Sequence, residues 1–264
     1  MAKMLTVSEM LVRGRISARD VARLHDEAFA DGIASAKDAK ALFELDAGCA
    51  DKDASWSRYF VETLTDYYVR RTEPHGSVSQ DQAQHLIRNI LRDGRIARQT
   101  ELELLLRIVE SADSCPADLT HVALKAVWDS VTAPEAAPYD RECAASAIAA
   151  ADIAVVRRAV GSAADGAVRV SRPVAELLCD LNDATAGSAN DPGWGALFVE
   201  TVAAHLIDPS GGRVGRNEAE WLRGQIAQDG ALDDNEKALL RFVKANAVAA
   251  DPLLDPLFAL AGKS

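Results

Sequence analysis

Apolar residues along the chain recur with the spacing of an α-helix rather than that of a strand. The clearest stretch has apolar residues at i, i+3, i+4, i+7 and i+8, which form one stripe on a helix. These residues are Ala83, Leu86, Ile87, Ile90 and Leu91. A second stripe consists of Val21, Leu24, Ala28 and Phe29. No stretch shows a sustained alternation of apolar and polar residues, so the pattern predicts an all-α fold.

Helix start signals stand between the apolar stripes. Three pairs have the spacing of a capping box, in which the side chains of the first residue and of a residue three positions later cap each other's backbone. The pairs are Ser17 and Asp20, Ser79 and Gln82, and Asp233 and Glu236. Asp251 is followed by Pro252, which suits a first helical turn. Stripes and caps together predict about six or seven helices in each half of the chain.

Two segments of the chain share one sequence pattern. WSRYFVETLTDYYV begins at Trp56 and WGALFVETVAAHLI begins at Trp194, and both contain Phe-Val-Glu-Thr. Further matches follow in the same order, namely Gly76 and Gly212, Asp93 and Asp229, Leu105 and Leu239, and Pro116 and Pro252. Ordered matches with little drift in offset predict an internal duplication.

The duplication predicts two helical halves, residues 1–133 and 134–264, with a pseudo-twofold relation. The segment TAPEAAPYD, residues 132–140, has two prolines and no apolar stripe, so it is the expected seam. Each half is expected to consist of two related units of helical hairpins. Gly14 and Gly76 each begin a Gly-x-apolar motif, and an Asp-Gly turn follows at the same distance after each of them.

Asp-Gly turns occur twice in each half and are followed closely by an apolar residue. Their aspartates are Asp31, Asp93, Asp165 and Asp229. A calcium-binding EF-hand loop needs oxygen ligands at loop positions 1, 3, 5 and 12. With each Asp-Gly at positions 5 and 6, position 3 has no oxygen-bearing side chain. The residues there are Phe29, Leu91, Ala163 and Ala227. The sequence therefore disfavours an EF-hand.

A structural corner explains these turns with fewer requirements. We expect the helix that runs up to Asp93 to end with Gly94 in the left-handed conformation, which glycine adopts without steric penalty. The apolar residues after the glycines are expected to pack against the core, and they are Ile33, Ile96, Val168 and Leu232. We also expect each Gly-x-apolar turn to pair with an Asp-Gly-x-apolar turn as a short extended bridge.

Two glutamates stand within the repeated Phe-Val-Glu-Thr, Glu62 and Glu200. Arg58 lies one helical turn before Glu62, but the equivalent position before Glu200 is Ala196, so an ion pair cannot explain both. A shared role as acceptors for the amides of an Asp-Gly turn is the favoured interpretation. Metal ligation is the alternative, because a buried carboxylate needs a cation or hydrogen-bond donors nearby.

Residues 75–109, HGSVSQDQAQHLIRNILRDGRIARQTELELLLRIV, resemble the tellurite-resistance TerB-like pattern of helices joined by Asp-Gly-x-apolar turns. The second copy, GGRVGRNEAEWLRGQIAQDGALDDNEKALLRFV (residues 211–243), is similar through Asp229, Gly230, Leu232 and Glu236. The resemblance implies an all-helical fold, no established catalysis, and divalent-cation binding through acidic side chains. By position these side chains are Asp93, Glu101, Asp229, Asp233 and Glu236. Gly76 and Gly212 depart from the family, which often has a further acidic Asp-Gly there.

Charge narrows the classes of partner. The chain of 264 residues has 40 acidic against 29 basic residues and a formal net charge of −11. Nucleic acid and anionic membrane surfaces are disfavoured, because both are bound by neutralising phosphates with Lys and Arg. Cations and basic proteins fit this charge better.

Cysteine spacing and hydropathy bear on the compartment. The four cysteines, Cys49, Cys115, Cys143 and Cys179, form no Cys-x-x-Cys pair, so zinc-knuckle and thioredoxin-like motifs are absent. The N-terminus lacks the apolar run of a signal peptide. The longest apolar stretch is interrupted by Asp152 and by residues 157–158, and it is too short to span a bilayer. We therefore expect a cytoplasmic protein with no membrane insertion.

These observations favour a non-catalytic interaction or regulatory protein that resembles TerB-like stress-response modules and binds a protein partner. A divalent-cation-binding protein with acidic clusters at the Asp-Gly turns is the alternative, and no other cofactor is expected. An enzyme with a site between the halves ranks third, because the chain has no Gly-x-Ser-x-Gly elbow and no phosphate-binding loop. His25 and His205 lie on or beside apolar stripes, so they are expected to be core residues rather than ligands.

Overall fold

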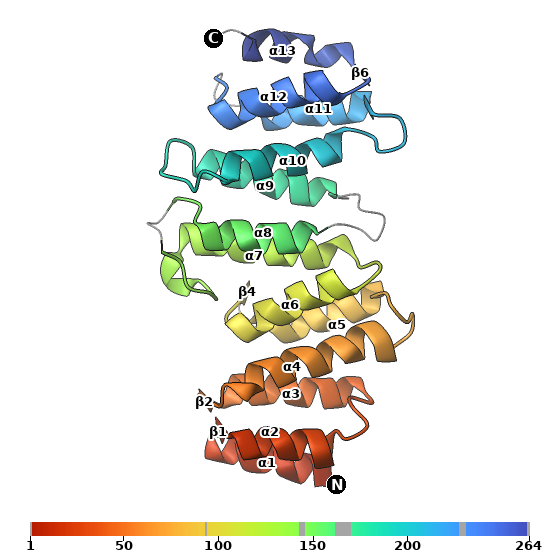
Figure 1. The fold of residues 1–264 in the computed structure, drawn as a ribbon, viewed down its shortest axis with the longest axis vertical. Coiled ribbons are helices and arrows are strands. Elements are labelled where there is room, and N and C mark those ends of the chain that lie inside the picture. The colour runs from red at the N-terminus through yellow and green to blue at the C-terminus, as the bar shows by residue number, and fades with distance from the viewer. Residues whose placement is uncertain (1, 93, 143–145, 162–169, 227–230, 263–264) are drawn as a thin grey trace. The chain divides into compact units, whose positions relative to one another are not determined.

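The computed structural model describes residues 2–92, 94–142, 146–161, 170–226 and 231–262 (Figure 1). Within these ranges the chain is mostly helical, and its strands are only two residues long. The predicted all-α fold is confirmed. The chain divides into two compact units, Met1–Leu119 and Thr120–Ser264. The expected boundary after residue 133 follows the end of helix α7 (Ala117–Thr132), whereas this division falls inside that helix.

The first unit contains six complete helices in its described part. They are α1 (Ala2–Arg13), α2 (Ala18–Arg23), α3 (Ala36–Gly48), α4 (Ser55–Thr65), α5 (Gln80–Ile90) and α6 (Gln99–Ser111). Helices α2 and α4 each continue into a π-helical turn, η1 (Leu24–Ala28) and η2 (Asp66–Arg71). Helix α4 packs on α6, and the two lie side by side in Figure 1.

The second unit continues with the remaining helices. They are η3 (Pro134–Ala136), α8 (Ala150–Val160), α9 (Arg172–Ala184), α10 (Trp194–Leu206), α11 (Arg216–Gln225), α12 (Asp234–Asn246), η4 (Pro252–Leu254) and α13 (Asp255–Ala261). Helix α10 packs on α9 and α12, and α12 packs on α13. No helix in the described ranges is both long enough and apolar enough to cross a bilayer.

The predicted apolar stripes form the core. Val21, Leu24, Ala28 and Phe29 are all buried, and so are Ala83, Leu86 and Ile90. The repeated tryptophans, Trp56 and Trp194, are each 1% exposed. The three predicted capping boxes are present at the starts of α2, α5 and α12, and Asp251 caps η4. Because these signals depend on residues close together in the chain, the sequence was sufficient to predict them.

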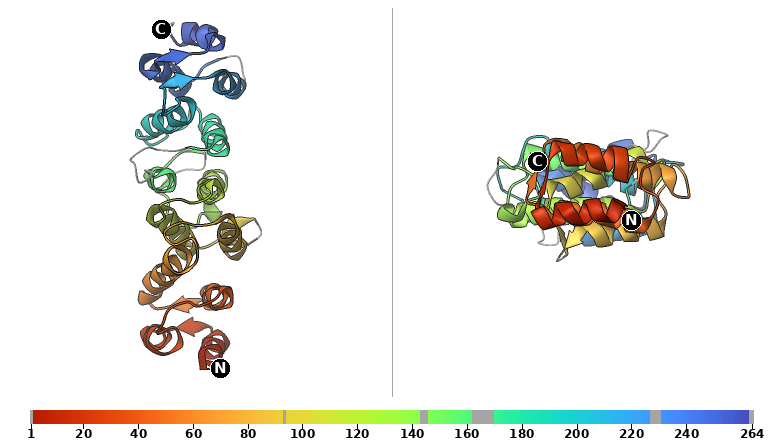
Figure 2. Two further views of the ribbon diagram at one scale, coloured as in Figure 1. Left: turned by 90° about the vertical axis from the view of Figure 1, so that its right-hand side faces the viewer. Right: turned by 90° about the horizontal axis from the view of Figure 1, so that it is seen from below.

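Three Gly-x-apolar motifs begin parallel bridges. Strand β1 (Arg15–Ile16) pairs with β2 (Asp51–Lys52), β5 (Arg213–Val214) pairs with β6 (Ala249–Ala250), and Ser77 pairs with Ser114. The red arrows of β1 and β2 and the cyan and blue arrows of β5 and β6 lie side by side in Figure 2. The preceding glycines have positive φ angles of 66° at Gly14, 82° at Gly76 and 62° at Gly212.

The expected pairing of Gly-x-apolar turns with Asp-Gly turns is wrong. The carbonyl oxygen of Gly14 accepts from the amide of Ala50 at 3.0 Å, and that of Gly76 accepts from Asp113 at 2.7 Å. These partners follow the second helix after the glycine, where the chain has returned to its starting end. An Asp-Gly turn lies at the far end of the first helix, which for the 11 residues of α5 is about 16 Å away.

The Asp-Gly turns have the predicted glycine conformation but a different helix end. Gly32 and Gly94 have φ angles of 77° and 79°. Ile33 and Ile96 are 2% and 3% exposed, as expected for residues that pack against the core. Helix α5 ends at Ile90 rather than at Asp93. Strand β3 (Leu91–Arg92) then pairs with β4 (Arg95–Ile96) as an antiparallel hairpin, which buries Ile96. Asp93, the turn at Asp165 and the turn at Asp229 lie outside the described residues.

Candidate functional site

The acidic residues implied by the TerB resemblance form hydrogen bonds at helix starts wherever they are described. Asp233 accepts from the amide of Glu236 at 2.7 Å, and Glu236 accepts from the amide of Asp233 at 2.8 Å. Glu101 is buried on α6 and accepts from Arg98 Nη1 at 2.9 Å. Asp93 and Asp229 lie outside the described part of the chain. Among the described residues no group of three or more His, Cys, Asp or Glu side chains is placed to hold a metal ion.

The repeated glutamates lie on the outside of their helices. The side chain of Glu62 is 71% exposed and lies 3.9 Å from Arg58 across one turn of α4. Glu200 is exposed on α10. Neither glutamate is buried, and water solvates an exposed carboxylate, so the burial that motivated metal ligation there is absent. Their role as acceptors for the amides of an Asp-Gly turn stays a prediction.

A buried aspartate that the sequence analysis missed organises the first unit. The side chain of Asp46 on α3 is fully buried. Its Oδ1 accepts from Trp56 Nε1 at 2.8 Å and from Lys52 Nζ at 2.9 Å. Its Oδ2 accepts from Thr100 Oγ1 at 2.8 Å, and Arg98 Nε lies 3.9 Å from it. These five residues, which we term the Asp46 cluster, join α3, β2, α4 and the start of α6.

An amide takes the place of that carboxylate in the second unit. Asn182 on α9 is 1% exposed. Its Nδ2 donates to Asp233 Oδ2 at 2.6 Å, and its Oδ1 accepts from Asn235 Nδ2 at 2.8 Å. Trp194 Nε1 is buried without a hydrogen-bond partner among the residues that the structure describes. We term Asn182, Trp194, Asp233 and Asn235 the Asn182 cluster.

The two clusters use equivalent positions in the sequence. LFELDA at residues 42–47 matches LCDLND at residues 178–183, which aligns Asp46 with Asn182. The N-cap residues of α6 and α12 are Arg98 and Asp233, so the cation of one cluster stands where the other has a carboxylate. This short match was the available signal, but it does not by itself show that the polar residue is buried.

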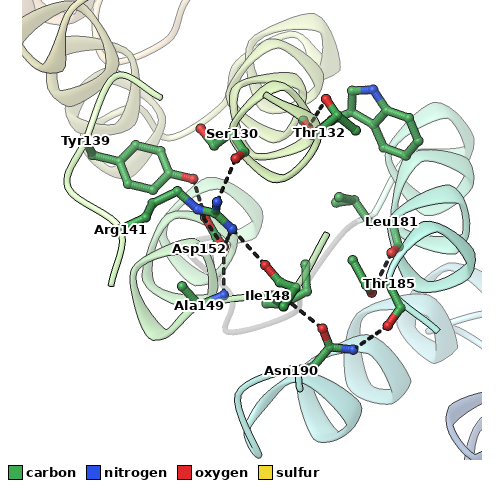
Figure 3. Close-up of polar contacts among 12 residues, drawn as sticks. Ser130, Thr132, Tyr139, Arg141, Ile148, Ala149, Asp152, Leu181, Thr185 and Asn190 are labelled. Atoms are coloured by element: carbon green, nitrogen blue, oxygen red, sulfur yellow. Dashed lines mark hydrogen bonds and ion pairs between the residues drawn. The ribbon is translucent and has the colours of Figure 1, made fainter. Parts of the chain in front are cut away.

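A third cluster lies at the segment expected to be the seam (Figure 3). The side chains of Arg141 and Asp152 are 2% and 0% exposed, and Arg141 Nη2 lies 2.6 Å from Asp152 Oδ2. Arg141 Nη1 also donates to the carbonyl oxygen of Ser130 at 2.7 Å. Asp152 accepts from Tyr139 Oη at 2.6 Å and from the amide of Ala149 at 2.7 Å. One carboxylate therefore caps α8 and fixes the preceding segment.

Tyr139 remains a hydrogen-bond donor in this cluster. Burial of its phenol, together with the neighbouring charge of Asp152, raises the pKa of Tyr139. The neutral hydroxyl can then donate to the carboxylate while the guanidinium of Arg141 supplies charge-assisted bonds. The expected seam is thus held by buried polar contacts within the second unit.

A more open version of this cap occurs at the start of α2. Asp20 is 3% exposed and accepts from the amide of Ser17 at 3.0 Å. Arg13 Nη2 donates to Asp20 Oδ1 at 2.7 Å, although the Arg13 side chain is 43% exposed. Burial opposes ionisation, but the hydrogen bonds from Ser17 and Arg13 outweigh it and lower the pKa of Asp20 to about 2.

These buried carboxylates are engaged in holding the fold. A general base must present a free lone pair within hydrogen-bond reach of a substrate or of water. Asp46 and Asp152 are fully buried, and their oxygens accept from fixed donors of neighbouring elements. Their arrangement supports helix packing rather than proton transfer.

The two histidines expected in the core differ from each other. The side chain of His25 is 74% exposed and lies 2.6 Å from Asp26, because the π-helical turn η1 rotates it off the apolar stripe. His205 is half-buried, contacts the carbonyl oxygen of Val170 at 3.0 Å and meets the ring of Trp221 edge-on. The expectation is wrong for His25.

An open groove of about 260 Å³ lies between α12 and α13. Its lining residues are Leu240, Arg241, Lys244, Ala245, Phe258, Ala261 and Gly262. Three large apolar side chains on or just after these two helices are exposed, namely Phe242 at 40% on α12, Val248 at 77% after α12 and Leu260 at 48% on α13. Exposed large apolar side chains on neighbouring helices beside an open groove suit an interaction surface. We term the groove and these three residues the α12–α13 surface.

No family model, curated protein or solved structure matches the chain. Its function is therefore inferred from its own residues.

Proposed function

We propose that this chain is a non-catalytic helical interaction protein of TerB-like character that binds a protein partner through the α12–α13 surface. The observation that carries this proposal is the exposure of large apolar side chains on α12 and α13, the two helices that line the groove, at Phe242 and Leu260, together with Val248 just after α12. Burying such side chains against a partner is favourable by roughly 25 cal/mol per Å² of apolar surface. The structural use of the buried carboxylates agrees with a role that needs no reacting group.

An internal duplication is the proposed origin of the fold. In support, the same pair of backbone hydrogen bonds occurs in both units. In the first unit the amide of Asp53 donates to the carbonyl oxygen of Ile16 at 2.8 Å, and the amide of Trp56 donates to the carbonyl oxygen of Asp53 at 2.9 Å. The amide of Asp191 likewise donates to Ile148 at 2.8 Å, and the amide of Trp194 donates to Asp191 at 2.9 Å. The second unit has Ser146 at the position that corresponds to Gly14. Ser146 has a positive φ of 61°, so the backbone conformation is kept although the glycine is not.

The cytoplasm is the proposed compartment, with stress response as the proposed context. Cys49 and Cys179 are buried free thiols, which suit a reducing environment. The formal charge of −11 disfavours nucleic acid as the partner.

Cross-linked capture from the native cell followed by reconstitution tests this proposal. The wild-type chain is compared with Phe242→Ser/Leu260→Ser, whose side chains are exposed so that the fold should persist. A partner that binds the purified wild type at a defined stoichiometry and binds the double variant at least about tenfold more weakly supports it. Failure to find any such partner, or equal binding to both chains, contradicts it.

A further inference from the structure

The groove between α12 and α13 has an apolar floor and a basic side. Leu240, Phe258 and Ala261 are buried and supply apolar contacts. Arg241 and Lys244 are exposed and stand one helical turn apart on α12. An apolar floor beside two cations selects a ligand that combines apolar and acidic groups.

Neither cation is paired with a carboxylate in the described part of the chain. Arg241 Nε donates to the carbonyl oxygen of Ala261 at 2.9 Å, and Lys244 Nζ lies 5.9 Å from the centre of the Phe258 ring. The other cation of α12, the half-buried Lys237, does have such a partner, because it lies 3.3 Å from Asp234. In a chain with 40 acidic residues, two neighbouring cations without carboxylates mark a place for an acidic group from outside.

The residues of α6 at the positions of Arg241 and Lys244 are apolar. Aligned by the N-caps of α6 and α12, which differs by one residue from the match of Leu105 with Leu239, Arg241 corresponds to Leu106 and Lys244 to Val109. Leu106 is 1% exposed and Val109 is half-buried. The face that is apolar and covered on α6 is thus open and basic on α12.

We propose that the α12–α13 groove binds an acidic amphipathic helix of a partner protein. The apolar side chains of that helix pack on Ala245 and Phe258, and its flanking carboxylates pair with Arg241 and Lys244. A helix laid in a groove presents such side chains at i, i+3, i+4 and i+7. This inference rests on the proposed interaction function and narrows the partner to one class of segment.

A synthetic peptide tests the inference directly. The probe is a rhodamine-labelled helix of about 18 residues with leucines at i, i+3, i+4 and i+7 and glutamates beside them. Its binding to the full chain is measured by fluorescence anisotropy, and a matched peptide has lysine in place of each glutamate. The glutamate peptide should bind, its affinity should fall as salt is added, and the lysine peptide should not bind.

Charge reversal on the groove locates the site. Arg241→Glu/Lys244→Glu should weaken binding by about tenfold or more, and Lys244→Glu alone by about threefold. The single variant keeps the Arg241 contact with Ala261, so it remains informative if the double variant loosens α13. The control is Arg19→Glu/Lys37→Glu, which makes the same change in net charge at exposed residues of the first unit and should bind as the wild type does.

Each remaining outcome decides against the inference. Absence of binding, or equal binding by the charge-reversed groove variants, overturns it. Self-association that is abolished by Arg241→Glu/Lys244→Glu, without peptide binding, also overturns it, because the occupant is then a second copy of the chain. If the reconstituted cellular partner still depends on Phe242 and Leu260, the interaction function stands and only the acidic-helix inference fails.

Discussion

The Asp46 and Asn182 clusters join helices at matching positions of the two units but place their charged groups differently. In the first unit a buried carboxylate on α3 accepts from Trp56, Lys52 and Thr100. In the second unit an amide at the matching position of α9 bridges Asp233 and Asn235. Both sites are polar, but the carboxylate is within helix α3 in the first unit and at the N-cap of α12 in the second. The difference indicates that these buried groups serve to join helices, because each one is engaged by hydrogen bonds from residues of neighbouring elements.

The largest expected effect is the loss of the carboxylate from the Asp46 cluster. Asp46→Ala leaves Lys52 and the indole of Trp56 without their buried acceptor, so it should lower the free energy of unfolding by about 3–5 kcal/mol. Asn182→Ala removes neutral hydrogen bonds and should cost about 1–3 kcal/mol. Urea unfolding followed by circular dichroism measures both. Equal losses from the two substitutions would show that the charge difference between the clusters has no energetic consequence.

Acid should weaken the first unit through Asp20. Its pKa is lowered to about 2 from 3.8, so its stabilising contribution is complete above pH 3.8 and is lost as the pH falls from about 4 to 2. The contribution is about 1–2 kcal/mol after allowing for solvent screening at the half-exposed Arg13. Asp20→Asn should flatten that part of the stability curve relative to the wild type. An unchanged slope in the variant would assign the acid sensitivity to other groups.

A smaller pH effect is expected from His85 at neutral to mildly acidic pH. Its Nδ1 lies 2.7 Å from Tyr68 Oη, and burial together with the nearby Arg88 lowers its pKa. Because the unfolded chain takes up this proton at a higher pH than the folded chain, stability should fall as the pH drops below about 6.5. The difference in melting temperature between wild type and His85→Gln, measured across pH 5–8, checks this. A wild-type curve parallel to that of His85→Gln would contradict it.

The smallest expected effect is that of divalent cations. Since Asp233 and Glu236 are occupied as a reciprocal cap, calcium, magnesium or zinc should shift the melting temperature of the chelator-treated chain by less than about 1 °C. A larger, saturable shift that disappears in Asp233→Asn, which keeps the capping amide hydrogen bond, would support the cation-binding alternative instead.

Local signals in the sequence predicted local structure well. The capping boxes at Ser17, Ser79 and Asp233 and the buried stripe through Leu86 depend on neighbours within one or two helical turns. The true end of α5 at Ile90 was missed because the antiparallel pairing of Leu91–Arg92 with Arg95–Ile96 competes with helix extension. That competition is decided by the burial of Ile96, which is a tertiary contact.

Long-range polar contacts could not be predicted in the same way. Thr100 and Asp46 are 54 residues apart in the chain, and the sequence around neither residue predicts their 2.8 Å hydrogen bond. Glu62 and Glu200 stand at the same place in the repeated Phe-Val-Glu-Thr, yet both are exposed. Repetition of a residue therefore indicated a shared position on the helix, and only the fold shows which side of the helix faces the solvent.

Titration calorimetry of the reconstituted partner against the wild type and Phe242→Ser/Leu260→Ser tests the central proposal most directly. We predict binding to the wild type and an affinity at least about tenfold weaker for the double variant, at unchanged melting temperature. Equal affinities for the two chains would contradict the assignment of the α12–α13 surface as the binding site.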